Sequence, residues 1–206
     1  MKRLLVFFFV CFISLFSFAG ERELFEKTHK EITQDISYVT LGNPKGNYII
    51  ITFFDYRCTW SRQFHKRLLT LIESGKIPNV RWIPIEAPVL GTNISLSEYI
   101  LAAKKQGKYK KLFIEATKQG IKSQEELKPL AQKLKIDFDQ LERDSKEQEI
   151  QDILIKNLDR HEVYDKREGV VPFVIFNKKL NAGSLTDEQI EDIIKESNRP
   201  IYSPKK

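Results

Sequence analysis

Cysteine is scarce in this sequence, because only two of its 206 residues, Cys11 and Cys58, are cysteines. Cys11 lies in an apolar N-terminal stretch that we expect to be cleaved off, so one thiol would remain. A chain with one thiol cannot form an internal disulfide, which excludes the class of secreted domains that depend on such bonds. Cys58 is therefore a candidate reactive group rather than half of a structural bridge.

A hydrophobic run long enough to span a bilayer is also missing. Two basic residues are followed by fifteen uncharged residues, Leu4 to Phe18, and then by Ala19. A spanning helix needs about 18 to 20 apolar residues. This pattern predicts a secretory signal peptide over residues 1–19, with small residues at its cleavage site. We therefore expect a domain over residues 20–206 that is not stably inserted in a membrane.

The sequence has no strong excess of one charge and few histidines. Lys and Arg number 34 against 28 Asp and Glu, and the two signs alternate along most of the chain. This argues against a nucleic-acid partner. The three histidines are scattered, and with a lone thiol they do not form a zinc pattern, so we predict no metal and no cofactor. His65 is predicted to lie on the surface, roughly 10 Å along its helix from Cys58.

The hydrophobic pattern predicts an α/β domain with helices on both faces of its sheet. The run 48–54 is β-branched or aromatic on both faces, as in a central strand. The other predicted strands are a short edge at 37–41, a strand at 79–85 whose Pro84 suggests an edge or an early end, and 170–176. Helical spacing continues from Cys58 to Gly75 and fills 95–167, with breaks predicted at Gly107, Gly120 and Pro129. A closing helix, 186–197, is predicted to be capped by Thr186.

The tetrapeptide Cys58-Thr59-Trp60-Ser61 stands where the central strand leads into a helix. A thiol at a helix start meets unpaired amides and the positive end of the helix dipole, and Arg57 adds a cation; both favour the thiolate. Ser61, one turn along, can donate a hydrogen bond to the sulfur. The alternative is that Cys58 is buried and inert. Thr59 and Trp60 either shape the surroundings of the thiol or serve only as a helix cap and a core residue.

Three segments resemble the DsbA-like thiol-disulfide oxidoreductases of the thioredoxin superfamily: residues 41–46, 53–58 and 169–175. The resemblance runs from about residue 39 to 197. It implies a thioredoxin-like fold with an inserted helical subdomain at about 92–167. It also implies a cis peptide bond before Pro172, beside the thiol, and a Val171 backbone that binds an extended client chain.

The sequence departs from this family at two positions. Ser61 replaces the second cysteine, and Thr52 replaces the buried acid that usually stands six residues before the first. In the family that acid handles the proton of the second cysteine, so the two losses are chemically consistent. Because a hydroxyl cannot resolve a mixed disulfide at neutral pH, this CxxS motif excludes the usual dithiol cycle.

The predicted function is that of a periplasmic monothiol protein that forms mixed disulfides with client proteins and supports disulfide isomerisation or reduction. A client thiol or a small thiol such as glutathione would release the client. The alternatives are a non-catalytic chaperone or client-binding module, and thiol protection by deglutathionylation. The predicted site comprises Cys58 and Ser61 as catalytic residues, Thr59, Trp60, Val171 and Pro172 as substrate-binding residues, and Arg57 as the thiolate-stabilising residue.

Overall fold

The computed structural model describes residues 20–91, 96–165 and 169–197. The chain divides into two compact units, Met1–Ser37 and Tyr38–Lys206. The described part of the first unit contains a helix over residues 20–34. The predicted signal peptide lies outside the described residues. Within the described ranges, no helix combines the length and the apolar character that crossing a membrane requires.

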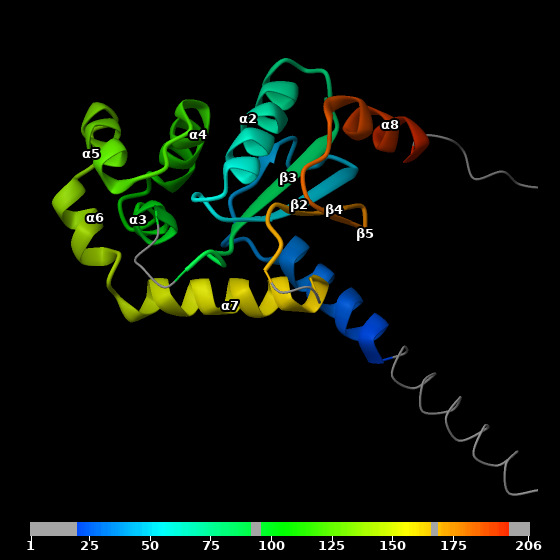
Figure 1. Ribbon diagram of the computed structural model, residues 1–206, viewed down its shortest axis with the longest axis horizontal. Helices are drawn as coiled ribbons and strands as arrows, with labels where there is room; N and C mark the ends of the chain where they lie inside the picture. The colour runs from blue at the N-terminus through cyan, green and yellow to red at the C-terminus, as the bar shows by residue number, and fades with distance from the viewer. Residues whose placement is uncertain (1–19, 92–95, 166–168, 198–206) are drawn as a thin grey trace, which may run out of the picture. The chain divides into compact units, whose positions relative to one another are not determined.

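The second unit contains both strands and helices, with a run of consecutive helices between β3 and β4 (Figure 1). In chain order its elements are β1 (Leu41–Gly42), β2 (Tyr48–Phe54), α2 (Thr59–Glu73), β3 (Val80–Glu86), α3 (Leu96–Ala102), α4 (Tyr109–Gln119), α5 (Gln124–Lys133), α6 (Phe138–Asp144), α7 (Gln148–Tyr164), β4 (Phe173–Phe176), β5 (Lys179–Ala182) and α8 (Asp187–Ser197). The strands form one sheet in the order β1-β3-β2-β4-β5. The pair β2 and β3 is parallel, and the other pairs are antiparallel.

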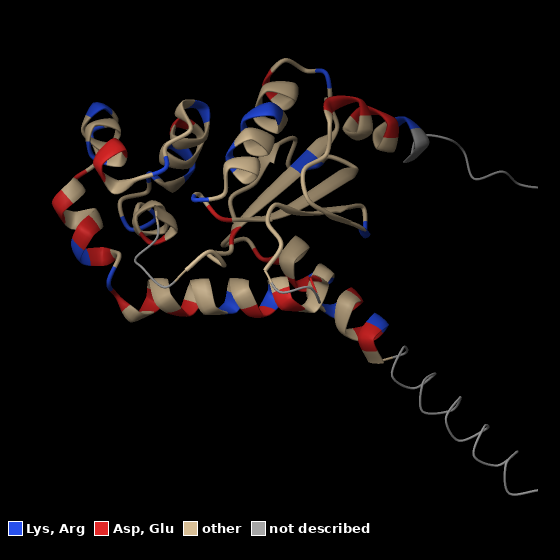
Figure 2. Cartoon of the chain, in the orientation of Figure 1, with Lys and Arg blue, Asp and Glu red and all other residues tan. Residues whose placement is uncertain are grey.

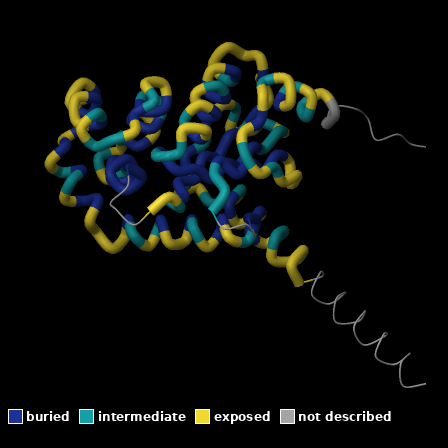
Figure 3. The backbone as a smooth tube through the Cα atoms, viewed as in Figure 1, coloured by how far each residue is buried: buried dark blue, intermediate teal, exposed yellow. Residues whose placement is uncertain are grey.

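The central strand β2 is covered on both faces, as its sequence predicts. Phe53 places its ring against His161 and Tyr164 of α7. Phe54, the next residue, places its ring 4.2 Å from that of His65 on α2. Because consecutive strand residues point to opposite faces, α7 and α2 cover different sides of the sheet (Figure 1). The sheet centre is accordingly the most buried part of this unit (Figure 3), and the α/β prediction is confirmed.

The predicted edge strand 37–41 is wrong in extent, since only Leu41 and Gly42 pair with β3. Tyr38 instead turns its hydroxyl toward α7, where it donates to Asn157 Oδ1 at 2.7 Å. Gly42 has φ 76°, and a Cβ there would lie 2.4 Å from the carbonyl oxygen of Val80. A glycine is therefore required at the point where β1 meets β3.

Of the two alternatives predicted for Pro84, an early end of the strand is wrong, whereas an edge position agrees with the pairing of β3. The strand continues to Glu86 and lies between β1 and β2. However, β1 pairs with β3 only at Trp82 and Arg81. At the level of Pro84 no strand of the described residues borders the outer side of β3, so a missing amide donor costs no ladder bond there.

The helices α3 to α7 lie between β3 and β4 in the chain. Gly120 ends α4 in the left-handed conformation, as predicted, whereas α5 continues through Pro129. Glu86 joins this block to the sheet, since Tyr109 of α4 donates to its carboxylate at 2.6 Å. Burial raises the pKa of Glu86, against the effect of that hydrogen bond. Basic and acidic residues are interspersed along the outer helices (Figure 2).

Candidate active site

Cys58 lies at the start of α2, directly after the turn that leaves β2. It is the N-cap residue, with extended backbone angles, and its side chain makes no capping hydrogen bond. The backbone N–H of Cys58 donates to the carbonyl of Asp55 at 3.0 Å, which closes the turn. Cys58 as a residue is partly exposed and its thiol is not in a disulfide. The structure therefore does not support a sealed, inert cysteine.

The proline loop, which we define as residues Val170 to Pro172, lies against the thiol. Sγ of Cys58 donates to the carbonyl oxygen of Val171 at 3.3 Å, across 113 positions in the sequence. The Val171–Pro172 peptide bond is cis, as the resemblance implies. Pro172 is buried and Val171 is partly exposed. The predicted nucleophile and the predicted client-binding backbone are thus brought together.

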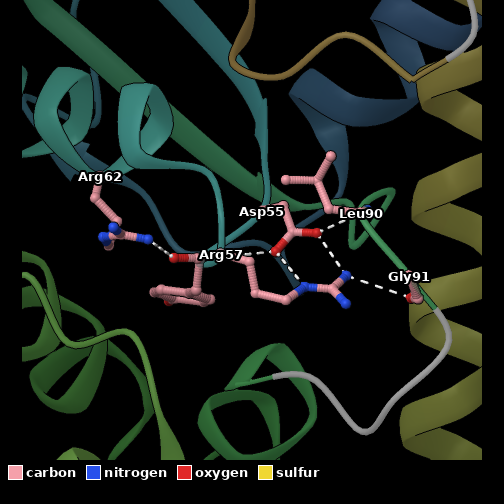
Figure 4. A network of polar contacts seen from close by, with 6 residues as sticks. Asp55, Arg57, Arg62, Leu90 and Gly91 are labelled. Carbon is pink, nitrogen blue, oxygen red and sulfur yellow. Dashed lines mark hydrogen bonds and ion pairs between the residues drawn. The ribbon is translucent and has the colours of Figure 1, made fainter.

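Arg57 has a different partner from the one expected. Its guanidinium binds the buried carboxylate of Asp55 through Nε at 3.1 Å and Nη2 at 2.7 Å (Figure 4). Nη2 also donates to Gly91 O at 3.3 Å. The hydrogen bonds with Asp55 raise the pKa of Arg57. Because Asp55 compensates its charge, the predicted effect of Arg57 on the thiolate is reduced, and its role there stays a prediction.

Asp55 organises the turn before Cys58 with the same carboxylate. It is fully buried and accepts hydrogen bonds from the backbone N–H of Arg57 at 2.8 Å and of Leu90 at 3.0 Å. The turn is therefore fixed to the segment after β3 (Figure 4). On its other side, Arg62 donates to the carbonyl of Tyr56 at 2.5 Å. Neither Asp55 nor Arg62 was among the predicted site residues.

Ser61 occupies the position of a second thiol, one turn into α2. It is fully buried, and its hydroxyl has no hydrogen-bond partner among the described residues. The predicted hydrogen bond from Ser61 to Cys58 is therefore not formed. Thr52, at the position of the family's buried acid, accepts a hydrogen bond from Trp82 Nε1 at 3.0 Å. The N–H of the Trp82 indole therefore has a hydrogen-bond acceptor without a carboxylate at position 52.

Thr59 and Trp60 both face outward on the first turn of α2. Thr59 is not the cap, because Cys58 holds that position, and its hydroxyl accepts a hydrogen bond from Arg62 Nη2 at 3.1 Å. Trp60 is not a core residue, since 66% of its surface is exposed. An exposed indole two residues after Cys58 is consistent with the predicted substrate-binding role, which stays a prediction.

His65 is buried, so the prediction of a surface position is wrong. Its ring packs between Phe54 at 4.2 Å and Trp82 at 4.9 Å, and Nε2 has no hydrogen-bond partner among the described residues. Burial in this apolar setting lowers the pKa of His65 to about 3. It is therefore neutral at physiological pH and serves as a core residue.

Two residues at the end of α7 contact the proline loop and were missed by the sequence analysis. His161 Nε2 lies 3.1 Å from the carbonyl oxygen of Val170, and Asp165 Oδ2 accepts from the Val170 N–H at 2.6 Å. His161 and Asp165 are four residues apart on a helix, and this spacing alone does not predict that they contact a loop. Elsewhere in the described ranges, no cluster of three or more His, Cys, Asp or Glu residues could hold a metal ion.

Comparison with solved structures finds several proteins of similar fold. A thioredoxin-like oxidoreductase from Silicibacter pomeroyi DSS-3 has 24% identity and a TM-score of 0.71, covering 83% of this chain and 98% of its own. The catalytic domain of Proteus mirabilis ScsC has 17% identity and a TM-score of 0.69, covering 85% and 97%. The thiol-disulfide exchange protein α-DsbA2 from Wolbachia pipientis has 23% identity and a TM-score of 0.68, covering 87% and 98%.

These structures share the fold of this chain. No curated protein matches the sequence. The family model described as thioredoxin matches residues 34–196, which is most of the chain. The chain therefore belongs to the thioredoxin family.

Proposed function

We propose that this chain is a periplasmic thiol-disulfide exchange protein with a single active thiol. It forms mixed disulfides with client proteins through Cys58 and supports isomerisation or reduction of their disulfides. The observation that carries this proposal is the position of Cys58, a partly exposed residue at a helix start whose Sγ lies 3.3 Å from Val171 O. The likeness to α-DsbA2, a thiol-disulfide exchange protein, supports it.

The first step is attack by the Cys58 thiolate on one sulfur of a client disulfide. A new bond forms between Cys58 and that sulfur while the client disulfide breaks. The other client sulfur leaves as a thiolate and takes up a proton from water. Cys58 is oxidised and the leaving sulfur is reduced, so the step needs no external electron donor.

The second step must use a thiol from outside the motif, because Ser61 holds the position of the resolving residue. A client thiol that attacks the mixed disulfide frees Cys58 and leaves the client with a different disulfide, which is isomerisation. Glutathione that attacks the Cys58 sulfur releases the client as a thiol. A second glutathione then restores Cys58 as oxidised glutathione leaves, which is reduction.

Reactivation of scrambled ribonuclease in the presence of a small thiol tests the proposal. We expect the wild type to accelerate reactivation, and Cys58→Ser to fall to the background rate although its side chain has a similar size. Thr70→Ala, an exposed substitution on the same helix, should match the wild type. Equal rates for the wild type and Cys58→Ser would contradict the proposal.

The exposed indole of Trp60 favours a second candidate function, a client-binding module. An apolar residue with 66% exposure, two positions after Cys58, can contact unfolded chains without covalent chemistry. Binding of an unfolded client that lacks cysteine separates the two functions. If the protein is a binding module, the Cys58→Ser variant should bind this client as tightly as the wild type does, and the Trp60→Ala variant should bind it more weakly. If the protein is a purely covalent catalyst, the wild type and both variants should all bind it weakly.

The periplasmic location in this proposal depends on the composition of residues 1–19. Intact mass of the protein recovered from the periplasmic fraction is the direct test. We expect a chain that begins near Gly20. A full-length chain retained in the membrane fraction would contradict this part of the proposal.

A further inference from the structure

Two side chains at the C-terminal end of α7 contact the backbone of the proline loop. Asp165, the residue that caps this helix, accepts a hydrogen bond from the Val170 N–H at 2.6 Å. His161 Nε2 lies 3.1 Å from the Val170 carbonyl oxygen. Both backbone polar groups of Val170 are therefore bound by side chains one helical turn apart. Val171, the next residue, is the one whose carbonyl accepts from Cys58 Sγ.

The donor in the contact between His161 and Val170 follows from the chemistry of the two atoms. A carbonyl oxygen only accepts, so Nε2 of His161 must carry the proton. The carboxylate of Asp165, 3.5 Å from the same nitrogen, favours a proton there. Burial lowers the pKa of His161, although Val170 and Asp165 oppose that effect. The ring acts here as a hydrogen-bond donor with a defined tautomer.

The imidazole of His161 is also fixed by packing. Only 4% of its surface is exposed, and its centroid lies 5.3 Å from that of Phe53 and 5.8 Å from that of Phe173. Phe53 belongs to β2, the strand that precedes Cys58, and Phe173 belongs to β4, the strand that follows the proline loop. The Nε2–H donor of His161 is thus fixed relative to both Cys58 and the proline loop.

We propose that His161 and Asp165 are positioning residues of the exchange site, which hold Val170 so that Val171 presents its backbone to a client beside Cys58. This inference rests on the proposed thiol-disulfide exchange. A small disulfide needs only the thiol, whereas an extended client chain needs the loop as well. Loss of the His161 donor should therefore slow attack on a peptide disulfide more than attack on a small one, because misplaced reactants lose rate.

The test uses two disulfides with the same coloured leaving group. One is 5,5′-dithiobis(2-nitrobenzoate), and the other is an extended peptide whose one cysteine is joined to 2-nitro-5-thiobenzoate. In each, the Cys58 thiolate bonds to one sulfur, the disulfide breaks, and 2-nitro-5-thiobenzoate leaves as a thiolate. The readout is the ratio of the two rate constants, peptide over small disulfide.

His161→Phe keeps the aromatic packing and removes the donor, and we expect it to lower this ratio about tenfold. His161→Gln replaces the ring with a side chain whose amide nitrogen can still donate, and it should bring the ratio most of the way back. Asp165→Leu should lower the ratio, and Asp165→Asn, which keeps an acceptor for Val170, should not. The Asp165 pair tests the proposal independently if His161→Phe fails to fold.

Asn157→Ala is the matched control on the same helix. Asn157 is equally buried, but it bonds to Tyr38 at 2.7 Å and to the Glu86 carbonyl at 3.0 Å instead of to the loop. Its ratio should equal that of the wild type. An equal fall in Asn157→Ala and His161→Phe, or an unchanged ratio in His161→Phe and Asp165→Leu, would overturn the inference. A wild type that attacks neither disulfide would instead refute the proposed function itself.

Discussion

The segment that contains the thiol and the segment that lies against it are held in similar ways. The thiol turn, which we define as residues Asp55 to Ser61, is fixed by the fully buried carboxylate of Asp55 through the backbone N–H groups of Arg57 and Leu90. The proline loop is fixed by the buried carboxylate of Asp165 through the N–H of Val170. In both, a carboxylate accepts from backbone amides, which is a strong type of hydrogen bond.

The two segments differ in what a nearby buried histidine does. His161 donates to the proline loop. Nε2 of His65, on the helix that follows the thiol turn, has no hydrogen-bond partner among the described residues. Burial of a histidine alone therefore says little about its role, and the hydrogen bond decides it. The thiol turn also contains the unsatisfied hydroxyl of Ser61, where a second thiol would complete a redox pair.

The largest effect is expected from Ser61→Cys, which would give the thiol turn the second thiol that it lacks. A second thiol one turn from Cys58 can attack the mixed disulfide within the same molecule, and intramolecular attack has a high effective concentration. We expect the lifetime of a mixed disulfide with a peptide to shorten by about a thousandfold. Acid quenching followed by intact mass measures that lifetime.

Ser61→Ala is the control for this experiment, because it removes the hydroxyl without adding a thiol. Its mixed disulfide should live as long as that of the wild type. A long lifetime in Ser61→Cys as well would show that position 61 cannot reach the Cys58 sulfur, and the CxxS motif would then not explain the single-thiol chemistry.

A smaller effect, on stability, is expected from Asp55→Asn. The change leaves the Arg57 guanidinium, of which 29% is exposed, without its counter-charge and weakens the acceptor of two backbone amides. Breaking a buried pair in this way costs about 3 to 5 kcal/mol, and the partial exposure of Arg57 reduces the expected loss to about 2 kcal/mol. Urea denaturation measures the free energy of unfolding.

Glu73→Gln is the matched control at the other end of α2, where Glu73 forms a surface ion pair with Lys118 at 2.9 Å. Exposed pairs contribute about 0 to 1 kcal/mol. Equal losses in the two variants would show that the thiol turn does not depend on its carboxylate, and its likeness to the proline loop would then be only geometrical.

The residues that sequence analysis identified correctly are those with a local signal. The bounds of β2 were predicted residue for residue because an apolar run on both faces is visible without knowledge of the fold. The start of α2 directly after Cys58 likewise has a local signal. The edge strand was wrong because Tyr38 bonds to Asn157, 119 positions away, and no pattern near Tyr38 encodes that contact.

For the site as well, some residues were predicted correctly and others were misplaced or missed. Cys58, Val171 and Pro172 come together as the family resemblance implies. The position of His65 was wrong because its burial depends on rings from β2, β3 and α4, which only the folded chain brings together. His161 and Asp165 were missed because their contact with Val170 depends on how the chain returns from α7 to β4.

The difference between the two histidines can be sharpened by the pH dependence of stability. Burial lowers the pKa of His65 to about 3, below the ordinary value of about 6.5 that it recovers on unfolding. Between these values the unfolded chain binds a proton that the folded chain does not, so stability is complete above about pH 6.5 and falls as the pH decreases.

We therefore expect the wild type to lose about 1.4 kcal/mol per pH unit below pH 6.5 relative to His65→Phe, which has no titrating group at this position. Urea denaturation of both proteins between about pH 4.5 and 7.5 measures the difference. His161→Phe should show a smaller difference, because the Val170 carbonyl and Asp165 oppose the effect of burial on the pKa of His161. Parallel stability curves for the wild type and His65→Phe would mean that His65 is hydrated or hydrogen-bonded in solution, and the distinction between the two histidines would no longer hold.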